Sequence, residues 1–142
     1  MGFDTYVHII CGVEVPLSLL KTASNKPTET FVKIANLILP DVIEHLRETY
    51  PGYDPYELAL AKDDIINTDA SEGGYYFLYF DDPCKIYVAC YHHSHCAGRV
   101  PDSISKMPSP PSPSHIKKFA EKCKLMGIDD TPKFYSITNI LH

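Results

Sequence analysis

The chain has 142 residues, of which 13 are Lys or Arg and 18 are Asp or Glu, so its formal net charge at neutral pH is -5. This acidic balance argues against general affinity for nucleic acids or anionic membranes. No apolar run approaches the roughly 18 residues that a membrane-spanning helix needs. The length predicts one domain over residues 1–142.

The cysteines and the first residues indicate where the protein resides. There are five cysteines, an odd number without the spacing of a secreted disulfide framework. The opening "MGFDTYVHIICGVEV" lacks the basic region of a signal peptide. We therefore expect free thiols and an intracellular, reducing compartment.

The first element expected along the chain is a β-strand over Tyr6–Val15. Apolar side chains recur there with a period of two, which is typical of a strand with one buried face. The predicted apolar face consists of Val7, Ile9, Cys11, Val13 and Val15. The opposite face carries His8 and Glu14.

A long helical pattern follows a polar loop. Pro27 and Thr28 mark its start, and apolar residues then recur at helical spacing. These residues are Phe31, Ile34, Ala35, Ile38, Val42, Leu46 and Tyr50. Because a proline inside a helix removes a hydrogen bond, we expect a kink or two abutting helices at Pro40. The segment Tyr56–Ala70 is ambiguous, because "ELALAK" favours a helical turn and "IINT" fits a short edge strand.

Two strands and a tight turn predict a β-hairpin. The strands are Tyr75–Phe80 and Lys85–Tyr91, and the turn between them is "DDPC". Pro83 cannot donate to a strand ladder, so it favours the turn.

The composition changes at residues 98–114, which are rich in Pro and Ser and predict an extended loop. Its "PSPPSP" stretch is a stiff connector or, alternatively, a docking motif for another protein. Ser112 and Pro113 then predict the N-cap and first turn of a second helix, and Gly127 its C-terminal cap. Lys133–Leu141 is expected to be the last strand.

The predicted order is strand, helix, two strands, helix, strand. This is the ferredoxin-like βαββαβ order, an α+β fold with an antiparallel sheet, two helices on one face and long loop insertions. In that topology the first and third strands are parallel neighbours. Glu14 is therefore expected near Cys90 and Tyr91.

One short stretch, "CYHHSHC" at Cys90–Cys96, is rich in transition-metal ligands. Strand alternation predicts that Cys90 and His92 point to the same side. The candidate metal site, with zinc as the expected ion, consists of Glu14, Cys90, His92, His95 and Cys96. The favoured interpretation is nevertheless the polar end of a strand that needs no cofactor, because all the nitrogen and sulfur ligands come from one run.

Tyrosines are frequent in the predicted strands, and one face of the predicted sheet is open. Because Tyr is enriched at protein interfaces, these side chains predict a homodimer or another protein contact. The expected interface residues are Tyr6, Tyr75, Tyr79, Tyr87 and Tyr91. Base stacking on RNA is the alternative, but the predicted strands supply only Lys85 and Lys133 as cations.

Three stretches together resemble small proteins of amoeba-infecting large DNA viruses of the Marseillevirus type. They are "MGFDTYVHIICGVEV", "GYDPYEL" and "MGIDDTPKFYSI". The resemblance implies a viral protein made in the host cytoplasm, or packaged in the virion, and it implies no activity.

These observations favour a non-enzymatic binding or structural protein, expected to be a homodimer. No catalytic residues are assigned. The alternatives are a zinc-binding module or metal-dependent enzyme that uses Cys90–Cys96, and an RNA-binding protein that uses the sheet.

Overall fold

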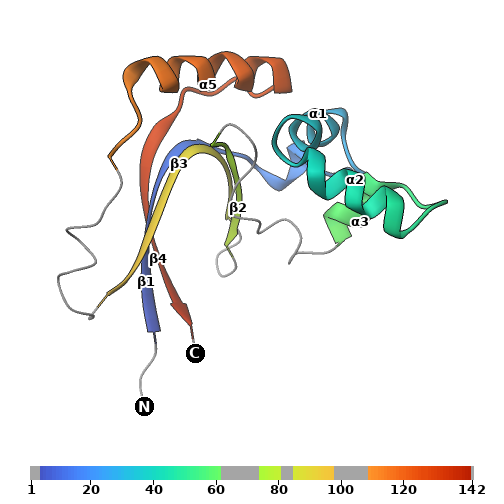
Figure 1. Ribbon diagram of the computed structural model, residues 1–142, viewed down its shortest axis with the longest axis horizontal. Coiled ribbons are helices and arrows are strands. Elements are labelled where there is room, and N and C mark those ends of the chain that lie inside the picture. The colour runs from blue at the N-terminus through green and yellow to red at the C-terminus, as the bar shows by residue number, and fades with distance from the viewer. Residues whose placement is uncertain (1–3, 62–73, 81–84, 98–108, 142) are drawn as a thin grey trace.

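A computed structural model describes residues 4–61, 74–80, 85–97 and 109–141 (Figure 1). These residues form an α+β fold with one four-stranded antiparallel sheet and four α-helices. The elements in chain order are β1 (Asp4–Glu14), the 3-10 turn η1 (Leu17–Leu19), α1 (Glu29–Ile38), α2 (Pro40–Thr49), α3 (Pro55–Ala61), β2 (Tyr76–Phe80), β3 (Lys85–Ala97), α5 (Pro113–Met126) and β4 (Lys133–Leu141).

The sheet has the strand order β2-β3-β1-β4, and each neighbouring pair is antiparallel. The predicted hairpin is present as β2 and β3. The expected parallel pairing of the first and third strands is wrong, and the ferredoxin-like arrangement that requires it is not confirmed. Alternation along a strand identifies its faces but does not encode its direction, which depends here on the long connection between β1 and β2.

All four described helices contribute side chains to one hydrophobic cluster. Side chains of the strands complete this cluster. The helical side chains at its centre are Phe31, Ile34, Ile43, Leu46, Ala59, Phe119, Cys123 and Met126. The strand side chains include Cys11, Val13, Phe77 and Val88. In Figure 1, α5 lies above the curved sheet, and α1, α2 and α3 lie beside β2. The helical layer is thus larger than the two helices expected from the sequence.

The long helical pattern is divided at Pro40, as predicted. The first helix, α1, ends at Ile38, and α2 begins with Pro40 in its first turn. The Oγ1 atom of Thr28 accepts a hydrogen bond from the backbone N–H of Phe31 at 3.2 Å, which caps α1. Two abutting helices result, with their buried sides in the same cluster.

Both ends of α5 match their predicted caps. The Oγ atom of Ser112 accepts from the backbone N–H of His115 at 3.2 Å, and Pro113 occupies the first turn. At the other end Gly127 has φ 84°, a left-handed conformation that glycine adopts without strain. The backbone N–H of Ile128 then donates to the carbonyl of Cys123 at 2.8 Å.

A second cluster lies on the opposite sheet face and contains strand residues only. Its buried members are Ile10, Leu78, Phe80, Tyr87 and Ala89, with Tyr76, Tyr135 and Ile137 partly buried against them. Tyr87 in β3 and Tyr135 in β4 lie on either side of β1, yet their ring centroids are 4.9 Å apart. Neighbouring strands are about 4.8 Å apart, so the two rings must lean toward each other across β1.

Gly12 in β1 allows an unusually close approach to β3. A Cβ atom built on Gly12 would lie 2.2 Å from the carbonyl oxygen of Val88 and 2.6 Å from the Cα of Ala89. Both are backbone atoms, which cannot move aside as a flexible side chain can. The glycine is therefore required by space between two strands.

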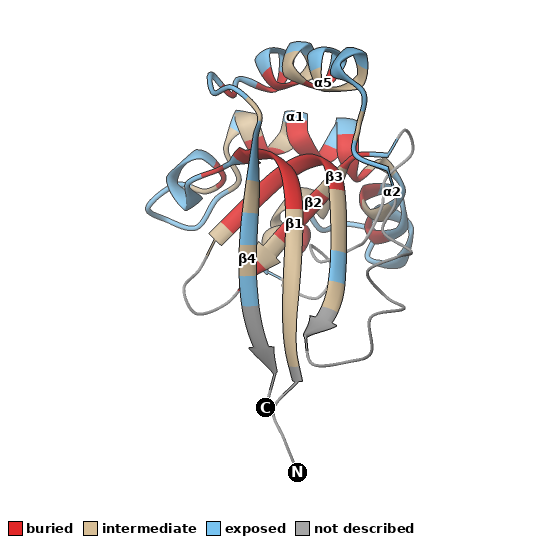
Figure 2. Cartoon of the chain, turned by 90° about the vertical axis from the view of Figure 1, so that its left-hand side faces the viewer, coloured by how far each residue is buried: buried red, intermediate tan, exposed pale blue. Residues whose placement is uncertain are grey.

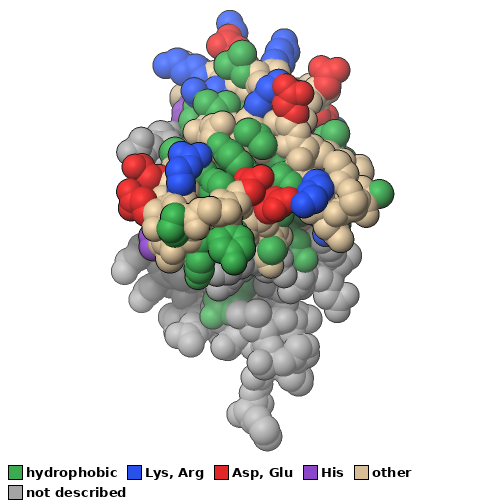
Figure 3. All heavy atoms as spheres, turned by 90° about the vertical axis from the view of Figure 1, so that its right-hand side faces the viewer, with side chains coloured by type: hydrophobic (Ala, Val, Ile, Leu, Met, Phe, Trp, Pro, Cys, Tyr) green, Lys and Arg blue, Asp and Glu red, His purple; other side chains and the backbone are tan. Residues whose placement is uncertain are grey.

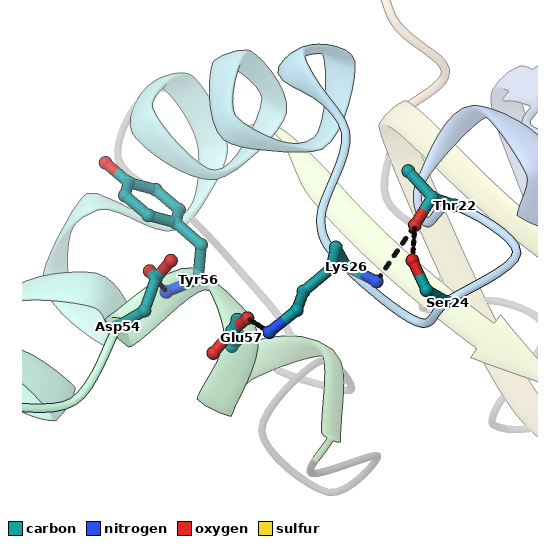
Figure 4. Close-up of polar contacts among 6 residues, drawn as sticks. All are labelled: Thr22, Ser24, Lys26, Asp54, Tyr56 and Glu57. Carbon is teal, nitrogen blue, oxygen red and sulfur yellow. Dashed lines mark hydrogen bonds and ion pairs between the residues drawn. The ribbon is translucent and has the colours of Figure 1, made fainter.

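The segment between β1 and α1 is held against α3 by exposed polar contacts (Figure 4). The Nζ atom of Lys26 lies 2.5 Å from Oε1 of Glu57, and this hydrogen bond raises the pKa of Lys26. Beside it, the hydroxyl of Tyr56 donates to Oδ1 of Asn36 at 2.6 Å. Exposed ion pairs contribute little to stability, so these contacts orient α3 more than they stabilise it.

In the part of the chain that the structure describes, no helix has both the length and the apolarity needed to cross a bilayer. Several predicted features lie outside the described residues. They are the edge-strand alternative at 65–68, the hairpin turn at 81–84 and most of the Pro- and Ser-rich loop at 98–114.

Candidate functional site

The ligand-rich run of β3 lies opposite the first half of β1, at the end of the sheet away from the helices (Figure 2). Four pairs define this register: His92 with Ile10, His93 with Ile9, His95 with Val7, and Cys96 with Tyr6. The register then shifts by one residue, so that Tyr91 pairs with Cys11 and Ala89 pairs with Gly12. Cys90 is the extra residue, which makes this position a β-bulge.

The bulge changes which side chains share a face. Cys90 and Tyr91 are consecutive, yet both belong to the helix-side cluster. His92 lies on the other side, where its ring contacts those of His8 and Tyr76. The prediction that Cys90 and His92 point to the same side is therefore wrong, since it assumed uninterrupted alternation.

The described residues of the predicted metal site do not converge. Glu14 pairs with Tyr87, and its carboxylate lies 3.8 Å from Nζ of Lys85. The Sγ atom of Cys90 donates to the carbonyl of Cys11 at 3.5 Å. Among the described residues, no three His, Cys, Asp or Glu side chains gather in a way that could hold a metal ion. The structure does not describe the side chain of Cys96.

The buried thiols are poorly suited to bind metal. Cys11, Cys90 and Cys123 are free and buried. Burial, reinforced by Cys11, raises the pKa of Cys90 to about 12, and burial raises the pKa of Cys123 to about 12 as well. Because the thiolate is the form that binds metal and attacks electrophiles, burial disfavours the reactive form of these thiols at neutral pH.

Antiparallel pairing brings together two histidines that the sequence did not connect. Nδ1 of His8 lies 3.0 Å from Nε2 of His92, and the two rings are nearly parallel, with centroids 5.3 Å apart. Phe80 meets the His8 ring edge-on at 4.8 Å. His8 stood on the less apolar face of the predicted first strand, but only the antiparallel register could have identified its partner.

His93 and His95 form a different pair on the helix-side face of the same strand. Their ring centroids are 5.9 Å apart. Nε2 of His93 and Nδ1 of His95 are buried and have no hydrogen-bond partner within the described ranges. Because neither nitrogen has a partner within hydrogen-bond distance, these two nitrogens do not meet each other.

Most of the predicted interface tyrosines are buried inside the chain. Tyr75, Tyr87 and Tyr91 are only 9%, 1% and 8% exposed. Tyr75 stacks on His115 and Phe119 with centroid distances of 5.8 and 5.7 Å. Tyr79 is half-buried against the helix-side cluster, and Tyr6 is half-buried.

The expectation of an open aromatic face is therefore wrong for the three buried tyrosines. One face packs against helices and the other forms its own cluster. Rings buried in this way cannot stack on the bases of a nucleic acid without unfolding. A different part of the sheet is exposed.

That surface is the β4 edge of the sheet. β4 is the last strand in the order β2-β3-β1-β4. From Lys133 to Thr138 its side chains are exposed or half-buried, and Phe134 is 57% exposed. Figure 2 shows this exposed strand beside β1. Of the described strands, only β1 pairs with it.

Other exposed apolar side chains lie on the helical part of the molecule. On the side seen in Figure 3, hydrophobic side chains are interspersed with acidic and basic ones. Large apolar residues exposed outside the sheet are Leu17, Leu19, Leu37, Tyr50, Tyr53 and Leu125. Isolated exposed apolar side chains are normal on protein surfaces.

Comparison of the chain with protein-family models, with curated proteins and with solved structures gives no match. The features that bear on function are therefore the geometry of the sheet edge and that of the histidine-bearing strands.

Proposed function

We propose that the protein is a non-enzymatic binding or structural protein that works as a homodimer, in which two copies pair through β4. The observation that carries this proposal is the nine-residue edge strand Lys133–Leu141, whose outer backbone groups have no strand partner among the described residues. Such an edge is a template on which another strand can be added.

The edge lacks the features by which proteins usually block such pairing. Lys133 is its one charged residue, and the strand contains no proline. Its register with β1 runs without a bulge from Asp4–Leu141 to Gly12–Lys133. Short length, charges, prolines and bulges are the usual protections of an edge strand, so β4 is open to a partner.

The sequence of β4 is compatible with pairing to itself. A twofold axis at Ile137 would place Ser136 opposite Thr138 of the second copy, and Ser–Thr pairs favour antiparallel ladders. Lys133 would lie opposite Leu141, so no like charges would meet. The half-buried Tyr135 and Ile137 would extend the strand-only cluster across the axis.

Light scattering on the purified chain tests the assembly. We expect a mass near twice the 16.0 kDa of one chain. The variant Ser136→Lys, Thr138→Lys changes two exposed positions and should be monomeric, because the added lysines would face each other across the axis. The control Ser114→Lys, Leu125→Lys adds the same charge to exposed positions of α5 and should remain dimeric.

Two results would overturn the proposal. A wild-type chain that is monomeric at micromolar concentration would remove the homodimer. A dimer that persists in the β4 variant and dissociates in the α5 variant would place the contact elsewhere.

The proposal also includes the origin of the protein and its location. The resemblance to proteins of amoeba-infecting large DNA viruses supports a viral protein of the host cytoplasm or the virion. Mass spectrometry of purified particles, together with antibody localisation in infected cells, tests it. Detection in neither place would contradict it.

A further inference from the structure

We propose a second contact between copies of this chain, in which the outer face of α5 in one copy docks on the outer face of α2 in another. The contact goes beyond the proposed function, because it uses surfaces away from β4 and joins single chains and dimers alike. The partner is a second copy, and complementary charges select it.

The outer face of α5 is basic in an acidic chain. Four lysines against one glutamate give α5 a net charge of +3, whereas the whole chain has -5. Lys117, Lys118 and Lys124 are exposed. None of the three forms an ion pair in the part of the chain that the structure describes. Uncompensated cations on one face attract an anionic partner.

The outer face of α2 carries the opposite charge. Asp41, Glu44 and Glu48 are exposed and recur at i, i+3 and i+7, which places them on one side of the helix. Within the described ranges, these carboxylates have no cation paired with them either. Arg47 lies about a third of a turn away from Asp41 around the helix, so the face remains acidic.

The two faces share one spacing with opposite charges. The basic triplet of α5 is Lys117, Glu121 and Lys124, and the acidic triplet of α2 is Asp41, His45 and Glu48. Both triplets follow i, i+4 and i+7, so the outer two residues of each lie about 10.5 Å apart along the axis. When the two helices lie parallel and side by side, each lysine meets a carboxylate. Glu121 then meets His45, whose ring N–H can donate to it.

The middle position of the triplets distinguishes this partner from other anions. A nucleic acid backbone presents a continuous row of negative charges, which would repel Glu121. The acidic triplet instead offers the imidazole of His45 at that position. The charge pattern therefore favours a second copy over a nucleic acid.

Both faces can be reached from outside the molecule. α2 packs on α1 and α3, and α5 packs on α1 and β3. In Figure 1, α5 lies above the sheet whereas α2 lies beside β2. Because the contact joins two different surfaces, it is heterologous, and its repetition builds an open chain of copies. Exposed ion pairs are individually weak, so this assembly needs a high protein concentration.

Sedimentation equilibrium at two salt concentrations tests the contact. At about 0.5 mM protein, the mean mass in about 20 mM salt should be about twice that in about 1 M salt, where a screening length of about 3 Å removes the attraction. The dimer at β4 is tested at micromolar concentration, so the two proposals fail separately.

Charge reversal identifies the two faces. The variants Lys117→Glu, Lys124→Glu and Asp41→Lys, Glu48→Lys each bring like charges together, so each should have the same mass at both salt concentrations. The variant with all four changes has the net charge of the wild type and should regain the twofold increase, which excludes net charge as the cause. All four positions are exposed. If a reversed chain unfolds, Lys117→Gln, Lys124→Gln tests the same loss.

Three results would overturn the proposal. The first is a wild-type mass that does not depend on salt. The second is a salt-dependent increase that persists in either two-residue reversal, or that does not return in the four-residue variant. The third is binding of a single-stranded RNA oligonucleotide by the wild type that Lys117→Glu, Lys124→Glu abolishes, because it would assign the basic face to nucleic acid.

Discussion

The β1–β3 ladder has two halves that differ in what covers them. From Ile86 through the bulge to Tyr91, every side chain is buried. Beyond it His92, His93 and His95 are half-buried and Ser94 is exposed. Figure 2 shows the change from red to tan along both strands. The same two strands therefore belong to the core at one end and to the surface at the other.

This difference shows that the length of a strand does not determine the extent of the core. In the buried half, apolar side chains meet helices on one face and other rings on the opposite face. In the histidine half, the ladder itself and contacts between imidazoles hold the strands together. We expect the histidine half to open locally at a lower free energy than the buried half.

The largest effect is expected from truncation of a side chain that lies beside the buried half of the ladder. Phe77 in β2 is buried and meets the Phe31 ring edge-on at 6.3 Å. Phe77→Ala should lower the free energy of unfolding by about 3–5 kcal/mol, measured by urea denaturation. Tyr6→Ala, in the half-buried part of β1, should cost less than half as much. Equal losses would contradict the division of the ladder.

A second variant acts at the boundary between the halves. Gly12→Ala forces a Cβ atom toward the carbonyl of Val88 and should destabilise the fold by about 1–3 kcal/mol. Gly52→Ala is the control, since its Cβ meets nothing within 4 Å and only its φ of 94° opposes the change. It should cost about 1 kcal/mol. A harmless Gly12→Ala would show that the strands can separate freely there.

The buried thiols predict an alkaline loss of stability. The pKa of Cys123 rises from 9.0 in an exposed thiol to about 12 in the folded chain. Between these values the unfolded state loses the proton while the folded state keeps it. Stability is therefore complete below pH 9 and falls by about 1.4 kcal/mol per pH unit for this thiol as the pH rises toward 12.

Urea denaturation at several pH values measures this slope. Cys123→Ala should be less stable than the wild type at pH 8 but should lose stability less steeply between pH 9 and 12. Tyrosines and lysines that titrate in the same range are present in both proteins, so their contribution cancels when the two slopes are compared. Identical slopes in the two proteins would mean that Cys123 ionises in the folded state.

The smallest effect concerns the two histidine pairs. A double-mutant cycle on His8 and His92 at pH 8, without metal, should give a coupling of about 0.5–1.5 kcal/mol, the usual net value of a hydrogen bond. The same cycle on His93 and His95 should give less than about 0.5 kcal/mol, because their unpartnered nitrogens do not meet. A larger coupling for the second pair would reverse the comparison.

Local sequence patterns were sufficient for the elements and their ends. Thr28, Pro40, Ser112 and Gly127 each act through their own backbone neighbourhood, and all four positions were predicted. Strand direction and the bulge at Cys90 depend on pairing with residues far along the chain. The predicted metal site and open tyrosine face both assumed a register and a layer that no local pattern contains. Among the described residues, Glu14, Cys90 and His92 do not converge, and Tyr75, Tyr87 and Tyr91 are buried.

The position of β1 in the centre of the sheet has a consequence for the way the chain acquires its fold. β1 is translated before both of its partners, β3 and β4, which come much later in the sequence. Its contact between His8 and His92 spans 84 residues, and Asp4 pairs with Leu141. Sheets built from such distant pairings fold slowly. A nascent chain would therefore carry β1 with both edges open until β3 and β4 leave the ribosome, a stage at which binding by a chaperone would prevent aggregation.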